Sequence, residues 1–220
     1  MIPLRDISRR PLHFPAATGL IIGINVAAFI LELVGGETFI KQWSMVPADI
    51  VAGHNWITIL SAIFLHAGLI HILGNMIFLW VFGPEIEDVM GAGRYLSFYM
   101  LGGLAATFAQ IIADPSSTIP NLGASGAIAA VMGAFIITYP RDRIRTVLLI
   151  GWFVRVTLIP AVFLIGFWFL IQLFSEVGSL VAMQRGGVAY MAHIGGFIFG
   201  MLTARIFEEP QRLAQRSRIA

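Results

Sequence analysis

One serine, two histidines and one asparagine are the residues of this chain whose types and spacing could do chemistry together: Ser125, His193, His71 and Asn75. A serine hydroxyl becomes a good nucleophile when an adjacent base such as histidine takes its proton. Attack on a carbonyl also needs hydrogen-bond donors aimed at the developing oxyanion. His71, Asn75 and the backbone N–H of Ser125 could supply these donors. The set is that of an acyl-transfer site, provided that the fold brings it together.

Each of the four residues lies near the start of an apolar segment. His71 and Asn75 are four residues apart, so they share one face of a helix expected at 69–82. Ser125 opens the apolar segment 124–139. The elements that must position the site are therefore apolar helices.

His193 lies in a third apolar segment, 188–206. It is about five residues from the start of that segment, which is roughly 8 Å at 1.5 Å per residue. The depth of His193 therefore matches that of the other three residues, if the three helices cross a membrane in the same direction.

The amino-acid composition indicates an integral membrane protein. Of the 220 residues, 58% are hydrophobic and only 12% are charged, against roughly 45–50% and about 25% in soluble domains. A soluble enzyme, a disordered chain and a nucleic-acid binder are excluded. The absence of cysteine excludes disulfides, thiolate metal sites and cysteine nucleophiles.

Six segments are candidates to cross a bilayer, whose core of ~30 Å needs about 20 apolar residues per helix. They are residues 16–34, 69–82, 95–112, 124–139, 157–174 and 188–206. The predicted fold class is thus all-α, a polytopic bundle of six transmembrane helices. The long apolar connection at 35–68 is predicted to be a membrane-embedded first loop.

The cations predict the orientation. Of the 14 Lys and Arg residues, only Lys41 and Arg185 fall on the side opposite the termini. Positive charge marks the cytoplasmic side, so both termini are predicted to be cytoplasmic. The expected organisation is a basic N-terminus at 1–15, a six-helix domain at 16–206 and a polar C-terminal tail at 207–220.

Small residues on two of the predicted helices favour close packing. They are Gly126, Ala129, Ala130 and Gly133 on one helix, and Ala192, Gly196 and Gly200 on the other. Small side chains at four-residue spacing let helix backbones approach closely. Such an approach is what a short serine hydroxyl needs in order to reach a histidine ring.

Each feature alone has a simpler reading. A glycine–serine motif in a membrane helix is more often packing than catalysis, and His193 or Asn75 could hydrogen-bond a neighbouring helix. His66 and His71 could bind a metal, but no third ligand has matching spacing. A transporter would need polar residues through to the cytoplasmic half, where the three helices are apolar.

Four motifs stand in order along the chain: His66-Ala-Gly-Leu-Ile-His71-Ile-Leu-Gly-Asn75, Gly83-Pro-Glu-Ile-Glu87, Gly123-Ala-Ser125-Gly126 and Ala192-His193-Ile-Gly-Gly196. This ordered set resembles the rhomboid intramembrane serine proteases of the minimal six-helix bacterial type. The resemblance covers about residues 16–206.

The resemblance implies a catalytic dyad without an acidic third residue. Ser125 would be the nucleophile, and His193 would be its general base and later general acid. His71, Asn75 and the backbone N–H of Ser125 would form the oxyanion hole. No metal and no cofactor is implied.

The resemblance also implies supporting roles. Gly123, Gly126 and Gly196 would allow helix packing, Glu87 would be a structural glutamate, and His66 would be a structural histidine. The helix at 157–174 would be a mobile lateral gate, and the stretch 175–187 would cap the site.

Two positions depart from the pattern of the family. Ile57 follows Trp56 where many members have an arginine, so any contact of that arginine is missing. Ala129 stands where some members have an aromatic residue that stacks on the catalytic histidine. Another group must therefore hold His193.

The expected activity is serine endopeptidase cleavage of other proteins within or near their transmembrane segments. The expected partners are those protein substrates and the lipid bilayer, not nucleic acid, and the sequence makes no prediction of an oligomeric state. The short chain favours a bacterial inner (plasma) membrane. The alternative is an inactive rhomboid-like protein that binds membrane clients, although such proteins typically lose the serine or the histidine.

Overall fold

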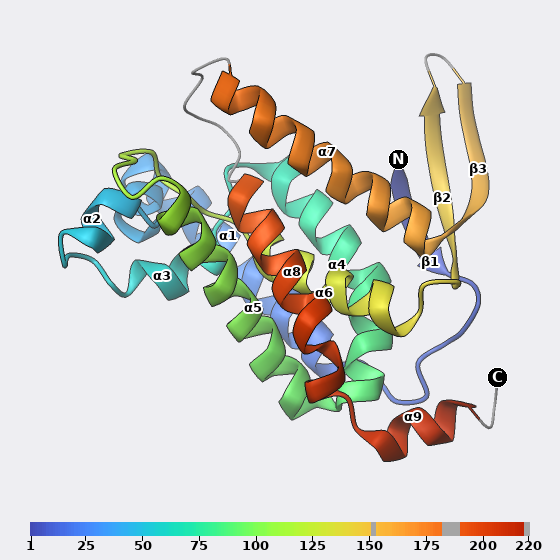
Figure 1. Cartoon of the computed structure of the whole chain (residues 1–220). Helices are drawn as coiled ribbons and strands as arrows, with labels where there is room; N and C mark the ends of the chain where they lie inside the picture. Colours follow the sequence, from blue (N-terminus) through green and yellow to red (C-terminus); the bar gives the residue numbers. More distant parts are fainter. Residues whose placement is uncertain (151–152, 182–189, 218–220) are drawn as a thin grey trace.

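The computed structural model of the chain describes residues 1–150, 153–181 and 190–217 (Figure 1). Within these residues, six helices have at least 14 residues: α1 (Ala16–Trp43), α4 (Leu69–Met90), α5 (Ala92–Ala113), α6 (Ser125–Thr138), α7 (Ala161–Val181) and α8 (Tyr190–Phe207). Shorter helical elements are α2 (Pro47–Val51), α3 (Thr58–Ser61), the 3₁₀ turn η1 (Ala62–Phe64) and α9 (Pro210–Ser217). The chain is thus mostly helical, as the sequence predicts.

The predicted helices at 16–34, 69–82 and 95–112 lie inside α1, α4 and α5. The helical backbone of α1 is interrupted at Gly36, which has a φ of 61°. Glycine adopts this positive φ without strain. The connection that follows folds into α2, α3 and η1. It leaves Trp56 and Ile57 more than half exposed, so its outer surface is apolar.

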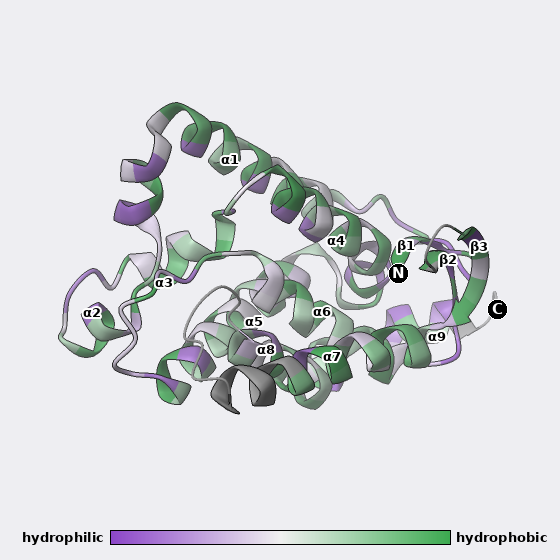
Figure 2. Cartoon of the chain, turned by 90° about the horizontal axis from the view of Figure 1, so that it is seen from above, coloured by the Kyte–Doolittle hydropathy of each residue, from purple (hydrophilic) through white to green (hydrophobic). Residues whose placement is uncertain are grey.

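Hydrophobic residues cover most of the long helices, while hydrophilic ones gather at helix ends, in connections and on α9 (Figure 2). Among the described residues, α1, α4, α5 and α8 are long and apolar enough to cross a membrane. The apolar part of α7 and the whole of α6 are shorter. The chain is therefore a membrane protein, and the count of six spans remains a prediction.

Helix α6 lies at the centre of the bundle. Residues 126–135 are all buried, because α4, α5 and α8 pack around the helix. Its 14 residues span only about 21 Å at 1.5 Å per residue, less than the ~30 Å of a bilayer core. Helix α6 is therefore too short to cross the whole bilayer core.

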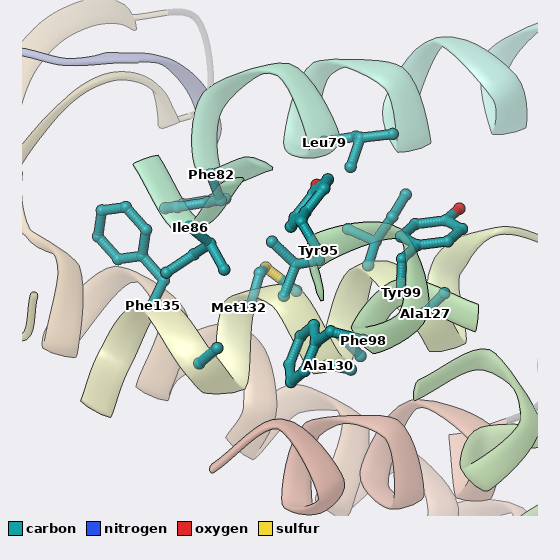
Figure 3. Packing of buried hydrophobic residues seen from close by; sticks show 14 of the residues in the cluster. Leu79, Phe82, Ile86, Tyr95, Phe98, Tyr99, Ala127, Ala130, Met132 and Phe135 are labelled. Atoms are coloured by element: carbon teal, nitrogen blue, oxygen red, sulfur yellow. The ribbon is translucent and has the colours of Figure 1, made fainter. Parts of the chain in front are cut away.

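The core fills the space between α4, α5 and α6 (Figure 3). Its largest fully buried side chains include Leu79, Phe82 and Ile86 of α4, Tyr95, Phe98 and Tyr99 of α5, and Met132 and Phe135 of α6. The rings of Phe82 and Phe135 meet edge to face with centroids 5.0 Å apart. Burial of such aromatic side chains fixes the three helices against one another.

A three-stranded antiparallel sheet corrects the expectation of an all-α fold. The strands β1 (Ile2–Asp6), β2 (Arg143–Ile150) and β3 (Phe153–Pro160) pair in that order. β-branched residues, which favour the strand conformation, make up half of β2 and half of β3. The sheet takes the first part of the helix predicted at 157–174, so α7 begins only at Ala161.

Only the first part of the segment predicted to cap the site, residues 175–187, is described by the structure. Helix α7 continues through residues 175–181 instead of ending at 174. Residues 182–187 of the predicted cap, including Arg185, lie outside the described residues, as do the first two residues of the helix predicted at 188–206. The first and last described elements, β1 and α9, lie toward the same end of the molecule (Figure 1).

Candidate active site

Ser125 and His193 are in direct contact. Ser125 is the first residue of α6, and His193 lies in the first turn of α8. The Oγ of Ser125 and the Nε2 of His193 are 2.7 Å apart, the distance of a good O–H···N hydrogen bond. The residues expected to form a dyad are therefore within proton-transfer distance.

Glycines bring these two helices together. A Cβ on Gly196 would overlap the carbonyl oxygen of Gly126, and one on Gly200 would overlap the carbonyl oxygen of Ala130. On its other side, Gly126 faces α5, where a Cβ would lie 2.5 Å from the Cβ of Ala106. The backbones of α6 and α8 thus touch directly, as the pattern of small residues predicts.

The ring of His71 on α4 lies near Ser125, with Gly123 between them. Its Nδ1 accepts the backbone N–H of Ala67 at 3.2 Å, so the neutral ring carries its proton on Nε2. A Cβ on Gly123 would lie 3.2 Å from this Nε2 and 3.3 Å from the Oγ of Ser125. Gly123, with φ 140°, therefore leaves open the space between donor and hydroxyl.

Asn75 lies one turn after His71 on α4 and is only 8% exposed. Its Nδ2 is buried and has no hydrogen-bond partner among the described residues. A buried amide without a partner is costly, unless a bound group supplies the acceptor. The backbone N–H of Ser125 belongs to the first turn of α6, where N–H groups have no partner within the helix.

These groups border one cavity of about 770 Å³ between α4, α6, α7 and α8. Its polar lining includes His71, Asn75, Asn121, Ser125 and His193, and Phe78, Ile128, Met132 and Trp168 supply much of its apolar lining. A cavity of this size can hold water or an extended peptide segment. The arrangement can support nucleophilic attack on a carbonyl whose oxygen faces α4.

Two residues of α7 that contact His193, Gln172 and Trp168, were missed in the sequence analysis. The Nδ1 of His193 is 2.7 Å from the Oε1 of Gln172 on α7. The ring of Trp168, one turn earlier on α7, lies 5.7 Å from the imidazole. Gln172 and Trp168 thus contact the ring of His193 in a chain that has Ala129 where a stacking aromatic residue could stand. A signal existed, because Gln172 is the single non-aromatic polar side chain of residues 161–174.

His66 does not line the cavity, but its ring packs against His71, which does. The ring of His66 is 1% exposed and meets the ring of His71 edge to face, with centroids 5.1 Å apart. The carboxylate of Glu32 on α1 accepts the backbone N–H of His66 at 3.0 Å. This contact ties the start of the His66–His71 turn to α1.

Glu87 lies at the other end of α4, 12 residues after Asn75, which is about 18 Å along the helix. Its carboxylate accepts the backbone N–H groups of Ala17 and Thr18 at 2.9 and 2.7 Å, and the hydroxyl of Thr18 at 2.8 Å. It therefore caps the N-terminus of α1. The structure does not bring Glu87 to the cavity.

Comparison with known proteins finds similarity to rhomboid proteins, both in a domain model and in individual relatives. A Rhomboid domain model matches residues 53–209. "Rhomboid protease GluP" of Bacillus subtilis (strain 168) is 29% identical over 201 residues, covering 90% of this chain and 36% of the relative. "Rhomboid protein 1, mitochondrial" of Saccharomyces cerevisiae is 30% identical over 189 residues, covering 83% of this chain and 50% of the relative.

The human "Presenilin-associated rhomboid-like protein, mitochondrial" is 27% identical over 192 residues, covering 82% of this chain and 45% of the relative. The chain thus spans half or less of the length of these curated relatives. Ser125 and His193 both lie within residues 53–209, which match the domain model.

Proposed function

Because this chain belongs to the rhomboid family, we propose that it is an intramembrane serine endopeptidase with a Ser125–His193 dyad. The observation that carries the proposal is the 2.7 Å contact between the Oγ of Ser125 and the Nε2 of His193. This contact lies at a cavity that the side chains of His71 and Asn75 also border. The substrates are other proteins, cleaved within or near their transmembrane segments.

In the first step, the Oγ of Ser125 attacks the scissile carbonyl while Nε2 of His193 takes the hydroxyl proton. The carbonyl oxygen becomes an oxyanion, which accepts hydrogen bonds from the Nε2–H of His71, the Nδ2–H of Asn75 and the backbone N–H of Ser125. The tetrahedral intermediate then expels the amine, which receives the proton from His193. An acyl-enzyme on Ser125 remains.

In the second step, water repeats the attack on the acyl-enzyme. His193 takes a proton from the water, and the collapse of the second intermediate returns that proton to the Oγ of Ser125. The carboxyl product leaves and the enzyme is restored. The cavity of about 770 Å³ has room for this water beside the bound segment.

A substrate segment must be locally unwound, since a helical backbone keeps its carbonyls in hydrogen bonds. Helix-breaking or small residues near the cleaved bond are therefore expected. The short α6 supports a site below the membrane surface, because Ser125 begins a helix that cannot span the bilayer core. An outward-opening cavity there would admit water while the surrounding helices exclude lipid.

The proposed topology has six spans with both termini in the cytoplasm. The position of β1 and α9 toward the same end of the molecule supports it, as does the bias of Lys and Arg in the sequence. We extend the proposal to a bacterial plasma membrane, while the named relatives include both a bacterial and mitochondrial proteins.

The alternative is an inactive rhomboid-like protein that binds clients. The hydrogen-bonded Ser125 and His193 argue against it, because a binding protein has no need of an activated nucleophile. Cleavage of a transmembrane substrate in liposomes tests the choice. The wild type should cleave, and Ser125→Ala and His193→Ala should each lose cleavage while keeping the wild-type unfolding temperature. Cleavage by either variant at the wild-type rate would refute the dyad.

A further inference from the structure

We propose that Gln172 is a positioning residue for the base, so that the catalytic unit extends from Ser125 through His193 to an uncharged amide on α7. The inference rests on the proposed protease function. It follows from the partners of the two ring nitrogens of His193. Nε2 is 2.7 Å from the Oγ of Ser125, and Nδ1 is 2.7 Å from the Oε1 of Gln172.

The amide oxygen determines which ring nitrogen carries the proton. An oxygen can only accept a hydrogen bond, so the Nδ1 of His193 must be the N–H donor toward Gln172. The neutral ring then has its lone pair on Nε2, where it can accept the proton of Ser125. The opposite tautomer would direct an N–H at the serine and leave the ring unable to act as a base.

The burial of Gln172 makes this contact strong. Its side chain lies on the inner face of α7 and is 9% exposed, so water competes little for its amide. Trp168 lies one turn earlier on α7, with its ring 5.7 Å from the imidazole at an interplanar angle of 42°. Gln172 holds the imidazole through a hydrogen bond to Nδ1. The ring of Trp168 packs against the imidazole and restricts its change of rotamer.

An amide suits this depth better than a carboxylate. A buried carboxylate is costly to desolvate in a membrane, whereas an amide orients the ring without a charge. Among the described residues, two other groups interact with the ring of His193. The hydroxyl of Ser125 on α6 hydrogen-bonds its Nε2, and His71 on α4 is the neighbouring titratable group. The orientation therefore depends on α7, a helix that carries neither the nucleophile nor the oxyanion donors.

The competing explanation is that Gln172 only ties α7 to α8. Gln110 of α5 is a matched control for that role, because its Oε1 accepts the backbone N–H of Ala192 at 3.3 Å. Gln110 thus ties another helix to α8 next to His193 without touching the ring. A purely structural glutamine at position 172 should behave like Gln110.

The test compares Gln172→Met, Gln172→Glu and Gln110→Met in the full chain. We would measure the rate of Ser125 labelling by a fluorophosphonate, kcat and KM for a transmembrane substrate, and thermal unfolding. Gln172→Met should lower kcat and the labelling rate by about 100-fold, within the range of base catalysis, with KM within about twofold. Gln110→Met should change neither rate by more than about threefold, and its unfolding should show any loss of packing.

Gln172→Glu retains an acceptor for Nδ1 and should restore most of the labelling rate. Its carboxylate favours the protonated ring, so the rising limb of the pH–activity profile should move to higher pH. This shift would appear even if Gln172→Met folds poorly, and loss of packing alone would not produce it.

The outcomes separate the two proposals. Wild-type protein that labels at Ser125, together with Gln172→Met that labels equally fast per folded molecule, would overturn the role of Gln172 and leave the protease function intact. Gln172→Glu that labels no faster than Gln172→Met would overturn it as well. Wild-type protein that neither labels nor cleaves would overturn the protease function and the positioning role together.

Discussion

The carbonyl oxygen of Gly126 on α6 occupies the space that a Cβ on Gly196 of α8 would need. Gly126 directly follows Ser125, and Gly196 lies three residues after His193. This backbone contact therefore sets the separation of the two helices at the level of the dyad. The distance between hydroxyl and imidazole depends on it as much as on the two side chains.

Gly196→Ala should separate α6 and α8 near the dyad. Because the nearest atoms are backbone, the helices themselves must shift, and overpacking of this kind costs about 1–3 kcal/mol. We expect a lower unfolding temperature and strongly reduced cleavage. Gly166→Ala on α7 is the control, since no atom lies within 4 Å of its Cβ position. Wild-type cleavage by Gly196→Ala would contradict the packing argument.

Asn75→Ala should slow catalysis without abolishing it. Loss of one oxyanion donor typically lowers kcat by about 10²–10³-fold, while His71 and the backbone N–H of Ser125 would remain. KM and the unfolding temperature should change little, because the Nδ2 of Asn75 has no partner among the described residues. Single-turnover kinetics would measure the effect. An unchanged kcat would remove Asn75 from the oxyanion hole.

Glu87→Gln should destabilise the fold and leave the chemistry intact. The carboxylate accepts three hydrogen bonds at the start of α1, and an amide can replace only part of them. We expect a loss of about 1–3 kcal/mol of stability, with normal cleavage per folded molecule. Glu37→Gln is the control, because the side chain of Glu37 is 87% exposed. A specific loss of cleavage without destabilisation would give Glu87 a different role.

Asp6 should make the stability of the sheet depend on pH. Burial raises the pKa of Asp6 to about 7, and the neighbouring carboxyl of Asp142 acts in the same direction. A carboxyl whose folded pKa is raised stabilises the fold fully below its usual pKa, and this contribution is lost as pH rises through about 7. Unfolding temperatures between about pH 4 and pH 8 would measure the loss, which runs from the usual pKa of the carboxyl to its raised value. Asp6→Asn should flatten the profile, and an equal slope in both proteins would exclude Asp6 as its source.

The sequence predicted the parts of the fold that follow from composition and local pattern. Apolar length located the helices at 16–34, 69–82 and 95–112, and the small residues of α6 and α8 predicted their close approach. Both signals are local, because the residues that carry the information are neighbours in the chain or on one helix face.

The sheet and the contact of Gln172 depend on distant partners. Ile2 of β1 pairs with Val147 of β2, a register that no local pattern reveals. The apolar, β-branched residues at 153–160 fit a strand or a buried helix equally well by periodicity. Gln172 was visible as a polar residue on an apolar helix, but its contact with His193 depends on how α7 packs on α8.

Fluorophosphonate labelling of the purified protein tests the central claim most directly, since the probe reacts with an activated serine. The account predicts a covalent adduct on the peptide that contains Ser125, formed in the wild type, absent in Ser125→Ala and strongly slowed in His193→Ala. A wild-type protein that stays unlabelled while correctly folded, or an adduct that persists in Ser125→Ala, would contradict it.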